Sequence, residues 1–213
     1  MQSIDTHQFN KIAETISGAG YCVVDKLFQS EFLDNLLARI TSIPPEQLKA
    51  AAIGRGELKN TNLTIRSDSI YWLNKANETD KDFLACMDQL RLAINQALYL
   101  GLFDYEAHYA TYQSGDFYNK HIDSLKGLSN RVLSTVLYLN KGWQPENGGE
   151  LILYDADDND KVLKTIQPVF GRLVIFLSEQ FPHEVLASNQ QRYSIAGWFR
   201  FNASDSTHID TLE

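Results

Sequence analysis

The stretch RVLSTVLYL, residues 131–139, decides the fold class of this chain. Side chains alternate between the two faces of a β-strand, so Ser134 and Tyr138 would share one face with two valines, while leucines and a threonine line the other. Both faces are largely apolar, which is typical of a strand covered on both sides. The sequence therefore predicts a central β-strand here, with two hydroxyl groups on a common face.

Further short strands flank this central one along the chain. From residue 105 onward the hydrophobic period is two, and turn residues such as Gly148, Gly149 and Gly171 separate the stretches. The predicted strands are 105–113, 117–123, 131–139, 150–154, 162–167, 172–177, 184–187 and 192–201. Regular short strands of this kind indicate a β-sandwich or a jelly roll.

The first half of the chain predicts helices that pack on this sheet. Residues 9–17 favour a short helix, and residues 21–24 favour a strand. Ser30 is a candidate cap for a second helix, which Pro44 and Pro45 end. A longer helix follows the capping residues Thr79 and Asp82 and carries one apolar stripe.

Nothing in the sequence marks a linker, because we find neither a repeat nor a low-complexity tract. We therefore expect a single domain that is α+β but mainly β. Its predicted parts are helices and edge strands over 1–104, the strand-rich catalytic core over 105–202, and a tail over 203–213.

Composition and charge exclude several classes of protein. The 213 residues are 44% hydrophobic and 22% charged, and we find neither an apolar run that could cross a bilayer nor a signal peptide. The net charge of −8 disfavours nucleic-acid partners. Only two cysteines occur, Cys22 and Cys86, each among apolar neighbours, which favours buried free thiols. We expect a cytoplasmic protein without a membrane partner.

Three side chains in the core suggest a metal centre. His121 and Asp123 stand two apart in the segment KHIDS, and side chains two apart on a strand point to the same face. His183 lies far downstream in FPHEV, and a jelly roll can bring such distant strands side by side. Two imidazoles and one carboxylate on one face of an octahedral ion leave three positions open, as in non-haem Fe(II) oxygenases.

Arg192 indicates which cosubstrate such an oxygenase would use. It lies in the strand-like RYSIAGWF segment, where Ser194 shares its face. A buried guanidinium binds a carboxylate in a two-pronged way and is costly without one. Arg192 and Ser194 would therefore hold the far carboxylate of 2-oxoglutarate, and Ser134 or Tyr138 could donate to the same carboxylate. O2 would take the last metal position.

Several short sequence motifs, which occur in the same order along the chain, resemble those of the 2-oxoglutarate- and Fe(II)-dependent prolyl hydroxylases of the oxygen-sensing type and their bacterial relatives. The similar stretch runs from about 105 to 202, and the segment before the long helix also matches. The matching phrases are IRSDSIYWL (65–73), YQSG (112–115), YNKHID (118–123), YLNKGW (138–143), GGEL (148–151), PHEV (182–185) and RYSI (192–195). The resemblance implies a double-stranded β-helix, or jelly roll.

The resemblance also implies roles for individual residues. His121, Asp123 and His183 would bind Fe(II), with ascorbate as a possible reductant. The residues expected at the 2-oxoglutarate pocket are Tyr112, Ser134, Tyr138, Arg192, Ser194 and Trp198. Those expected on the substrate side are Asp68, Arg131 and Arg55, the last in a finger-like loop. Arg131 has the strand parity opposite to Ser134 and Tyr138, which would put it on the other face.

The function that this family resemblance implies is protein prolyl 4-hydroxylation, with succinate and CO2 as the other products. The partner would be a peptide or protein that bears proline, and a translation factor is a plausible one. Two alternatives stay open: a hydroxylase of a free amino acid or other small molecule, and a non-catalytic jelly roll that senses metal or 2-oxoglutarate. A nucleic-acid demethylase is disfavoured, because Trp198 stands where those proteins carry a second arginine.

Overall fold

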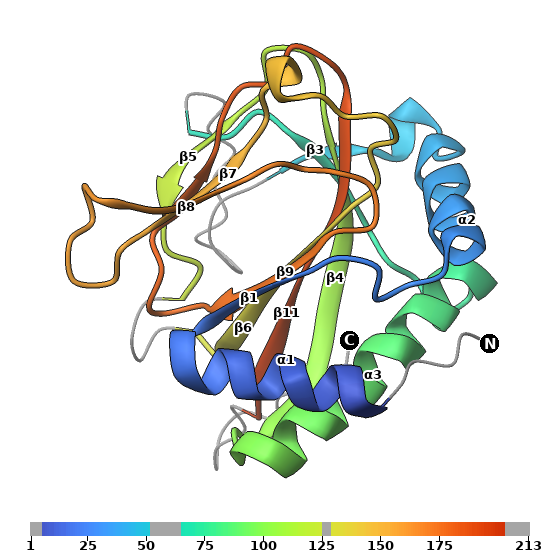
Figure 1. Ribbon diagram of the computed structural model, residues 1–213. Coiled ribbons are helices and arrows are strands. Elements are labelled where there is room, and N and C mark those ends of the chain that lie inside the picture. The colour runs from blue at the N-terminus through green and yellow to red at the C-terminus, as the bar shows by residue number, and fades with distance from the viewer. Residues whose placement is uncertain (1–5, 52–64, 125–128, 203–213) are drawn as a thin grey trace, which may run out of the picture.

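Two antiparallel β-sheets and three helices form the structure, a computed structural model that describes residues 6–51, 65–124 and 129–202 (Figure 1). The helices are α1 (Thr6–Ala19), α2 (Ser30–Thr41) and α3 (Glu78–Leu98), with short 3₁₀ turns at Pro45–Gln47 and Pro145–Asn147. In the described residues, no helix combines the length and the apolar character needed to span a membrane.

The larger sheet has seven strands in the order β1-β9-β6-β11-β4-β3-β2. Their bounds are β1 Tyr21–Val24, β2 Lys49–Ala50, β3 Ser69–Trp72, β4 Leu102–Tyr112, β6 Arg131–Tyr138, β9 Leu173–Leu177 and β11 Arg192–Phe201. The smaller sheet has the order β5-β10-β7-β8. Its strands are β5 Tyr118–His121, β7 Leu151–Tyr154, β8 Val162–Ile166 and β10 His183–Val185. The predicted central strand, β6, indeed lies between β9 and β11.

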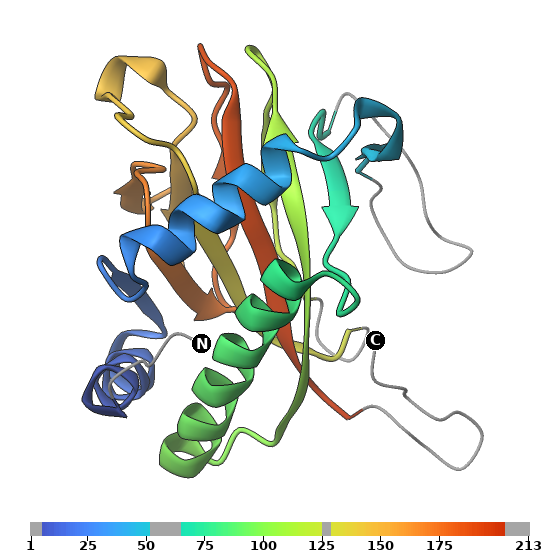
Figure 2. The same ribbon diagram turned by 90° about the vertical axis from the view of Figure 1, so that its right-hand side faces the viewer.

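Strand alternation on the larger sheet separates two apolar cores. On β11, Ile195 and Phe199 join the core under the helices, and Figure 2 shows α2 and α3 lying across this outer face. Tyr138 on β6 instead joins the core between the two sheets, together with Leu153 of β7 and Val185 of β10. Each fully buried large apolar side chain contributes roughly 1.5–3 kcal/mol. The face that looks toward the smaller sheet is called the inner face below.

The predicted jelly roll is confirmed, while several local predictions need correction. Ser30 does not cap α2, because it is already the first helical residue and Gln29 is the N-cap. Asn77 caps α3 by accepting from the Thr79 and Asp80 amides, two residues before the predicted signal began. The strands β2 and β3 were not predicted.

Two predictions about single residues have different outcomes. Cys22 and Cys86 are buried free thiols as expected, and burial raises the pKa of Cys86 to about 11. The strand predicted over 117–123 ends at His121, so Asp123 lies beyond β5 rather than on it. Another contact must therefore bring Asp123 to the two histidines.

Candidate metal and cosubstrate site

His121, Asp123 and His183 converge, although they come from distant parts of the chain. His121 of β5 and His183 of β10 are direct cross-strand partners. The Nε2 atoms of both histidines lie 3.6 Å from the carboxylate oxygens of Asp123. One ligand atom from each of the three residues lies within 4.8 Å of the others. Such spacing fits a single ion bound to two nitrogens and one oxygen.

Backbone carbonyls orient both imidazoles toward this common point. The Nδ1 atom of His121 lies 2.8 Å from the Asn119 carbonyl, and that of His183 lies 3.0 Å from the Phe181 carbonyl. A carbonyl only accepts hydrogen bonds, so each Nδ1 carries the proton and each Nε2 keeps its lone pair. The Nε2 atoms are therefore prepared to bind a cation.

Asp123 is held from the opposite sheet rather than by its own strand. The Ser134 hydroxyl on β6 donates to Asp123 Oδ2 at 2.6 Å, and Ser178 lies 2.9 Å from Ser134. Ser134 was expected to serve the 2-oxoglutarate carboxylate beside Arg192. Its contacts place it on the metal side instead, because β6 carries it well away from Tyr138 along the strand.

The protonation states of the site suit metal binding. Burial, and then the neighbouring His121, lower the pKa of His183 to about 4, so this imidazole is neutral near pH 7. Burial alone would raise the pKa of Asp123, but His183 and His121 nearby hold it well below its usual range. A neutral imidazole and an ionised carboxylate are the forms that bind divalent metals.

Arg192 is the centre of a second, separate cluster of side chains on the inner face. It is 1% exposed, and its guanidinium lies 4.8 Å from the ring of Tyr112 and 4.9 Å from that of Tyr138. One nitrogen donates to Ser194 at 3.3 Å, as expected from their shared face. Arg192 Nε and the Tyr138 hydroxyl are buried without a hydrogen-bond partner among the described residues. Burial raises the pKa of Tyr138, so its hydroxyl remains a donor.

These unsatisfied donors test whether the site fits 2-oxoglutarate. Buried polar groups are normally hydrogen-bonded, and a buried cation normally has an anionic partner. In the described part of the chain, Arg192 forms no ion pair with an acidic side chain. A carboxylate would satisfy Arg192 Nε and the Tyr138 hydroxyl together. The residues present therefore fit a cosubstrate whose far end is a carboxylate.

The predicted substrate-side residues lie apart from one another, Arg131 beside Trp198 and Asp68 beside Arg66. The Arg131 guanidinium lies 3.5 Å from the centroid of the Trp198 ring, so Trp198 contacts Arg131 rather than Arg192. Asp68 is fully buried and accepts two hydrogen bonds from Arg66, each 2.7 Å long. Arg55 lies outside the described residues.

The parity prediction for Arg131 is wrong for a specific reason. The register of β6 against β11 shifts between Phe199 and Arg200, so that Arg200 pairs with Arg131 and Val132 is the extra residue. A bulge of this kind turns the following side chain to the other face. Arg131 consequently shares the inner face with Ser134.

Some site residues were not nominated from the sequence. Tyr118 stacks on His121 with ring centroids 3.6 Å apart, and the Arg66 guanidinium lies 4.3 Å from the Tyr118 ring. Ser178 contacts Ser134, and Glu106 contacts Arg131. For Glu106 a signal existed, because it shares strand parity with Tyr112 on β4. Ser178 gave none, since its contact depends on how two strands pair.

This fold and site define a class: a jelly-roll dioxygenase that uses a divalent metal and a carboxylate cosubstrate. Comparisons with known proteins agree. Residues 107–200 match the family model described as 2OG-Fe(II) oxygenase superfamily. The crystal structure of a Pseudomonas putida prolyl-4-hydroxylase superposes with a TM-score of 0.83 and 38% identity, covering 92% of this chain and 100% of that one.

Two animal relatives match over most of their length as well. A Trichoplax adhaerens prolyl hydroxylase, solved in complex with a hypoxia inducible factor peptide fragment, has a TM-score of 0.81 and 25% identity over 92% of this chain and 90% of that one. Human prolyl hydroxylase EGLN3 is 27% identical over 91% of this chain and 83% of its own length. The chain belongs to the 2-oxoglutarate- and Fe(II)-dependent prolyl hydroxylase family. It is a dioxygenase, and its family uses Fe(II) and 2-oxoglutarate.

Proposed function

We propose that this enzyme hydroxylates C4 of a proline residue within a peptide or protein. The observation that carries the proposal is the match, at 38% identity, over the whole length of a prolyl-4-hydroxylase. The Trichoplax relative binds a peptide fragment, which supports a peptide rather than a free amino acid as the substrate class.

The metal would be held by His121, Asp123 and His183, and the far carboxylate of 2-oxoglutarate by Arg192 and Tyr138. When bound, these groups supply oxidative chemistry in which one oxygen atom of O2 enters succinate, CO2 leaves, and the other oxygen atom becomes the hydroxyl of the product. The protein's part is to hold and orient. Ser134 fixes the Asp123 carboxylate, and the Asn119 and Phe181 carbonyls fix the two imidazoles.

The experiment combines purified protein, Fe(II), 2-oxoglutarate and ascorbate with proline-containing peptides. We expect succinate release that depends on the peptide, and a peptide mass gain of one oxygen atom. Asp123→Ala should reduce turnover by about 1000-fold or more, because the charged metal ligand is lost. His7→Ala, a change on the exposed side of α1, is the matched control and should keep full turnover.

Two outcomes would redirect the assignment. Mouse prolyl 3-hydroxylase OGFOD1 is 35% identical, although over only 42% of this chain and 17% of its own length. Comparison of the product with 3- and 4-hydroxyproline standards therefore decides the position of the hydroxyl. Turnover of free proline but of no peptide would overturn the peptide proposal.

The identity of the protein substrate is a finer proposal. A translation factor, offered as an intact folded protein beside its proline peptides, is the candidate to test first. Labelling of cytoplasmic extract proteins with ¹⁸O2 would test both this substrate and the proposed cytoplasmic location. Absence of ¹⁸O in the translation factor would remove it.

A further inference from the structure

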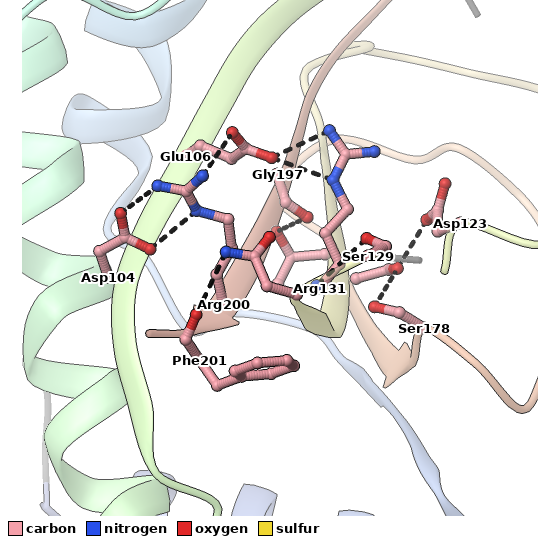
Figure 3. Close-up of polar contacts among 12 residues, drawn as sticks. Asp104, Glu106, Asp123, Ser129, Arg131, Ser178, Gly197, Arg200 and Phe201 are labelled. Atoms are coloured by element: carbon pink, nitrogen blue, oxygen red, sulfur yellow. Dashed lines mark hydrogen bonds and ion pairs between the residues drawn. The ribbon is translucent and has the colours of Figure 1, made fainter. Parts of the chain in front are cut away.

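Four charged side chains form a line on the inner face, at the end far from Arg192. Figure 3 shows Asp104, Arg200, Glu106 and Arg131, which alternate in sign. Arg200 pairs with Asp104 through two hydrogen bonds and lies 3.6 Å from Glu106 Oε2. Glu106 Oε1 in turn accepts a hydrogen bond from Arg131 Nε at 2.9 Å, and Arg131 Nη2 forms an ion pair with the same oxygen, also at 2.9 Å. We call these four residues the charge ladder.

Burial differs along the charge ladder. Asp104, Glu106 and Arg200 are all buried, whereas the Arg131 side chain remains 18% exposed. Charges removed from water are tolerated only when they are paired and hydrogen-bonded, and the two acids and two bases of the ladder balance each other. The buried members therefore form a fixed base, and Arg131 is the member that contacts solvent.

Arg131 lies on the inner face close to the metal triad. Its guanidinium lies flat over Trp198, and Trp198 pairs in register with Ser134, the residue that holds Asp123. An arginine side chain has several rotatable bonds, so a cation–π contact alone allows the guanidinium group to take several positions over the ring. The hydrogen bond and the ion pair to Glu106 select one of them.

We propose that Glu106 is a positioning residue for the prolyl substrate. Glu106 itself touches neither substrate nor metal; it fixes the Arg131 guanidinium across Trp198, where the substrate would enter, and Arg200 with Asp104 fixes Glu106. The proposal rests on the proposed function, because it names which residues set the shape of the substrate side. Glu106 would thus have a role in substrate binding, although it has none in the hydroxylation chemistry itself.

The rival explanation is that Glu106 only neutralises buried arginines. Loss of its charge would then lower stability without a specific effect on substrate binding. Asp80 provides a matched control, because it is also a fully buried acid beside an arginine, Arg39, 3.5 Å away. It accepts a hydrogen bond from Tyr109 on the helix-covered side of the sheet, away from the site.

The kinetic experiment compares Glu106→Gln, Arg131→Gln, the double variant and Asp80→Asn in the Fe(II)-loaded enzyme. Glu106→Gln should raise KM for the peptide about tenfold, since a misplaced contact group costs binding, and leave KM for 2-oxoglutarate unchanged. In the Arg131→Gln background the same change should add less than about twofold, because residues that act through one another are not additive. Asp80→Asn should leave both KM values unchanged.

A second readout needs no substrate. The chain has three tryptophans, so Trp72→Phe with Trp143→Phe leaves Trp198 as the single fluorophore. In this background Glu106→Gln should increase acrylamide quenching of Trp198, because the guanidinium no longer covers the ring, whereas Asp80→Asn should not. Unchanged quenching, or a full tenfold KM effect that persists without Arg131, would overturn the proposal. If the wild-type protein hydroxylates no proline peptide, the proposed function fails, while the quenching result still decides whether Glu106 holds Arg131.

Discussion

The inner face of the larger sheet carries arginines at both ends, and the two ends differ in how the charge is balanced. Arg192 is buried among the rings of Tyr112 and Tyr138 and forms no ion pair with an acid in the described residues. At the other end, Arg200 and Arg131 alternate with Asp104 and Glu106. The metal triad lies between these ends.

This difference separates a binding site from a scaffold. A buried cation without an anion lowers stability unless a ligand completes it, so the Arg192 end is built for an anionic ligand. A balanced set of charges needs no ligand and holds its own geometry. Substitutions at the two ends distinguish these two roles.

Arg192→Met should have the largest effect, because it removes the unpaired cation that distinguishes the Arg192 end from the charge ladder. The dissociation constant for 2-oxoglutarate should rise about 100-fold, because a two-pronged charged contact is lost. The ligand-free protein should be as stable as the wild type or more stable, since an unbalanced buried charge is gone. Anaerobic titration and thermal unfolding measure the two effects. Arg172→Met, which removes a partly exposed partner of Asp25, is the control and should leave 2-oxoglutarate binding intact.

Arg200→Met should act in the opposite way. It leaves Asp104 and Glu106 as neighbouring buried acids, which should lower the free energy of unfolding by about 3 kcal/mol. Affinity for 2-oxoglutarate should stay within about twofold of the wild type, given additivity between distant sites. Chemical denaturation of the metal-free protein provides the stability. An unchanged midpoint and slope would mean that the charge ladder is not a balanced scaffold.

His108 makes the scaffold end sensitive to acid. Burial, with Arg66 and Arg131 nearby, lowers its pKa well below the ordinary 6.5. The unfolded chain binds a proton near pH 6.5 that the folded chain does not, so stability is full above this pH and falls as the pH decreases below it. His108→Gln should flatten this decline by about 1.4 kcal/mol per pH unit. Denaturation of metal-free protein between pH 7.5 and 5 measures it; equal slopes would contradict a buried neutral His108.

Gly149→Ala should give the smallest effect, at the binding end. Gly149 has a φ of +70°, and an added Cβ would lie 3.1 Å from Arg192 Cδ and 2.9 Å from Ser188 Cβ. We expect a stability loss of about 1–2 kcal/mol and 2-oxoglutarate affinity reduced about threefold. Gly18→Ala, where no atom lies within 4 Å of the added carbon, is the control. If both variants bind 2-oxoglutarate equally, the Arg192 pocket tolerates displacement.

The sequence predicts the jelly roll and the convergence of the triad because both depend on strong patterns. The period of two in β4, β6 and β11 requires strands, and His121, Asp123 and His183 together make up a ligand set typical of non-haem Fe(II). The reason given for Asp123 was nevertheless wrong. Strand parity does not place it; the hydrogen bond from Ser134 does.

What the sequence could not predict depends on the pairing between strands. One extra residue, Val132, turns Arg131 to the inner face, and no local pattern marks such a bulge. The charge ladder needs Arg200 of β11 beside Asp104 and Glu106 of β4, which only the sheet order decides. The N-caps of α2 and α3 were misplaced by a residue or two, since several polar residues near each helix start could cap it.

One of the two proposed metal-binding histidines, His121, lies on a short strand that has few backbone contacts. His121 ends β5, a four-residue strand at the edge of the smaller sheet that is paired to β10 through two registered positions and to Arg66 through a single bridge. Short edge segments fray before a globular core melts. Warming should therefore abolish catalysis while the helices are still intact. Amide exchange in β5 should be slow only when a divalent ion binds His121 of β5 and His183 of β10 together. The bound metal would then stabilise β5 as well as serve the reaction.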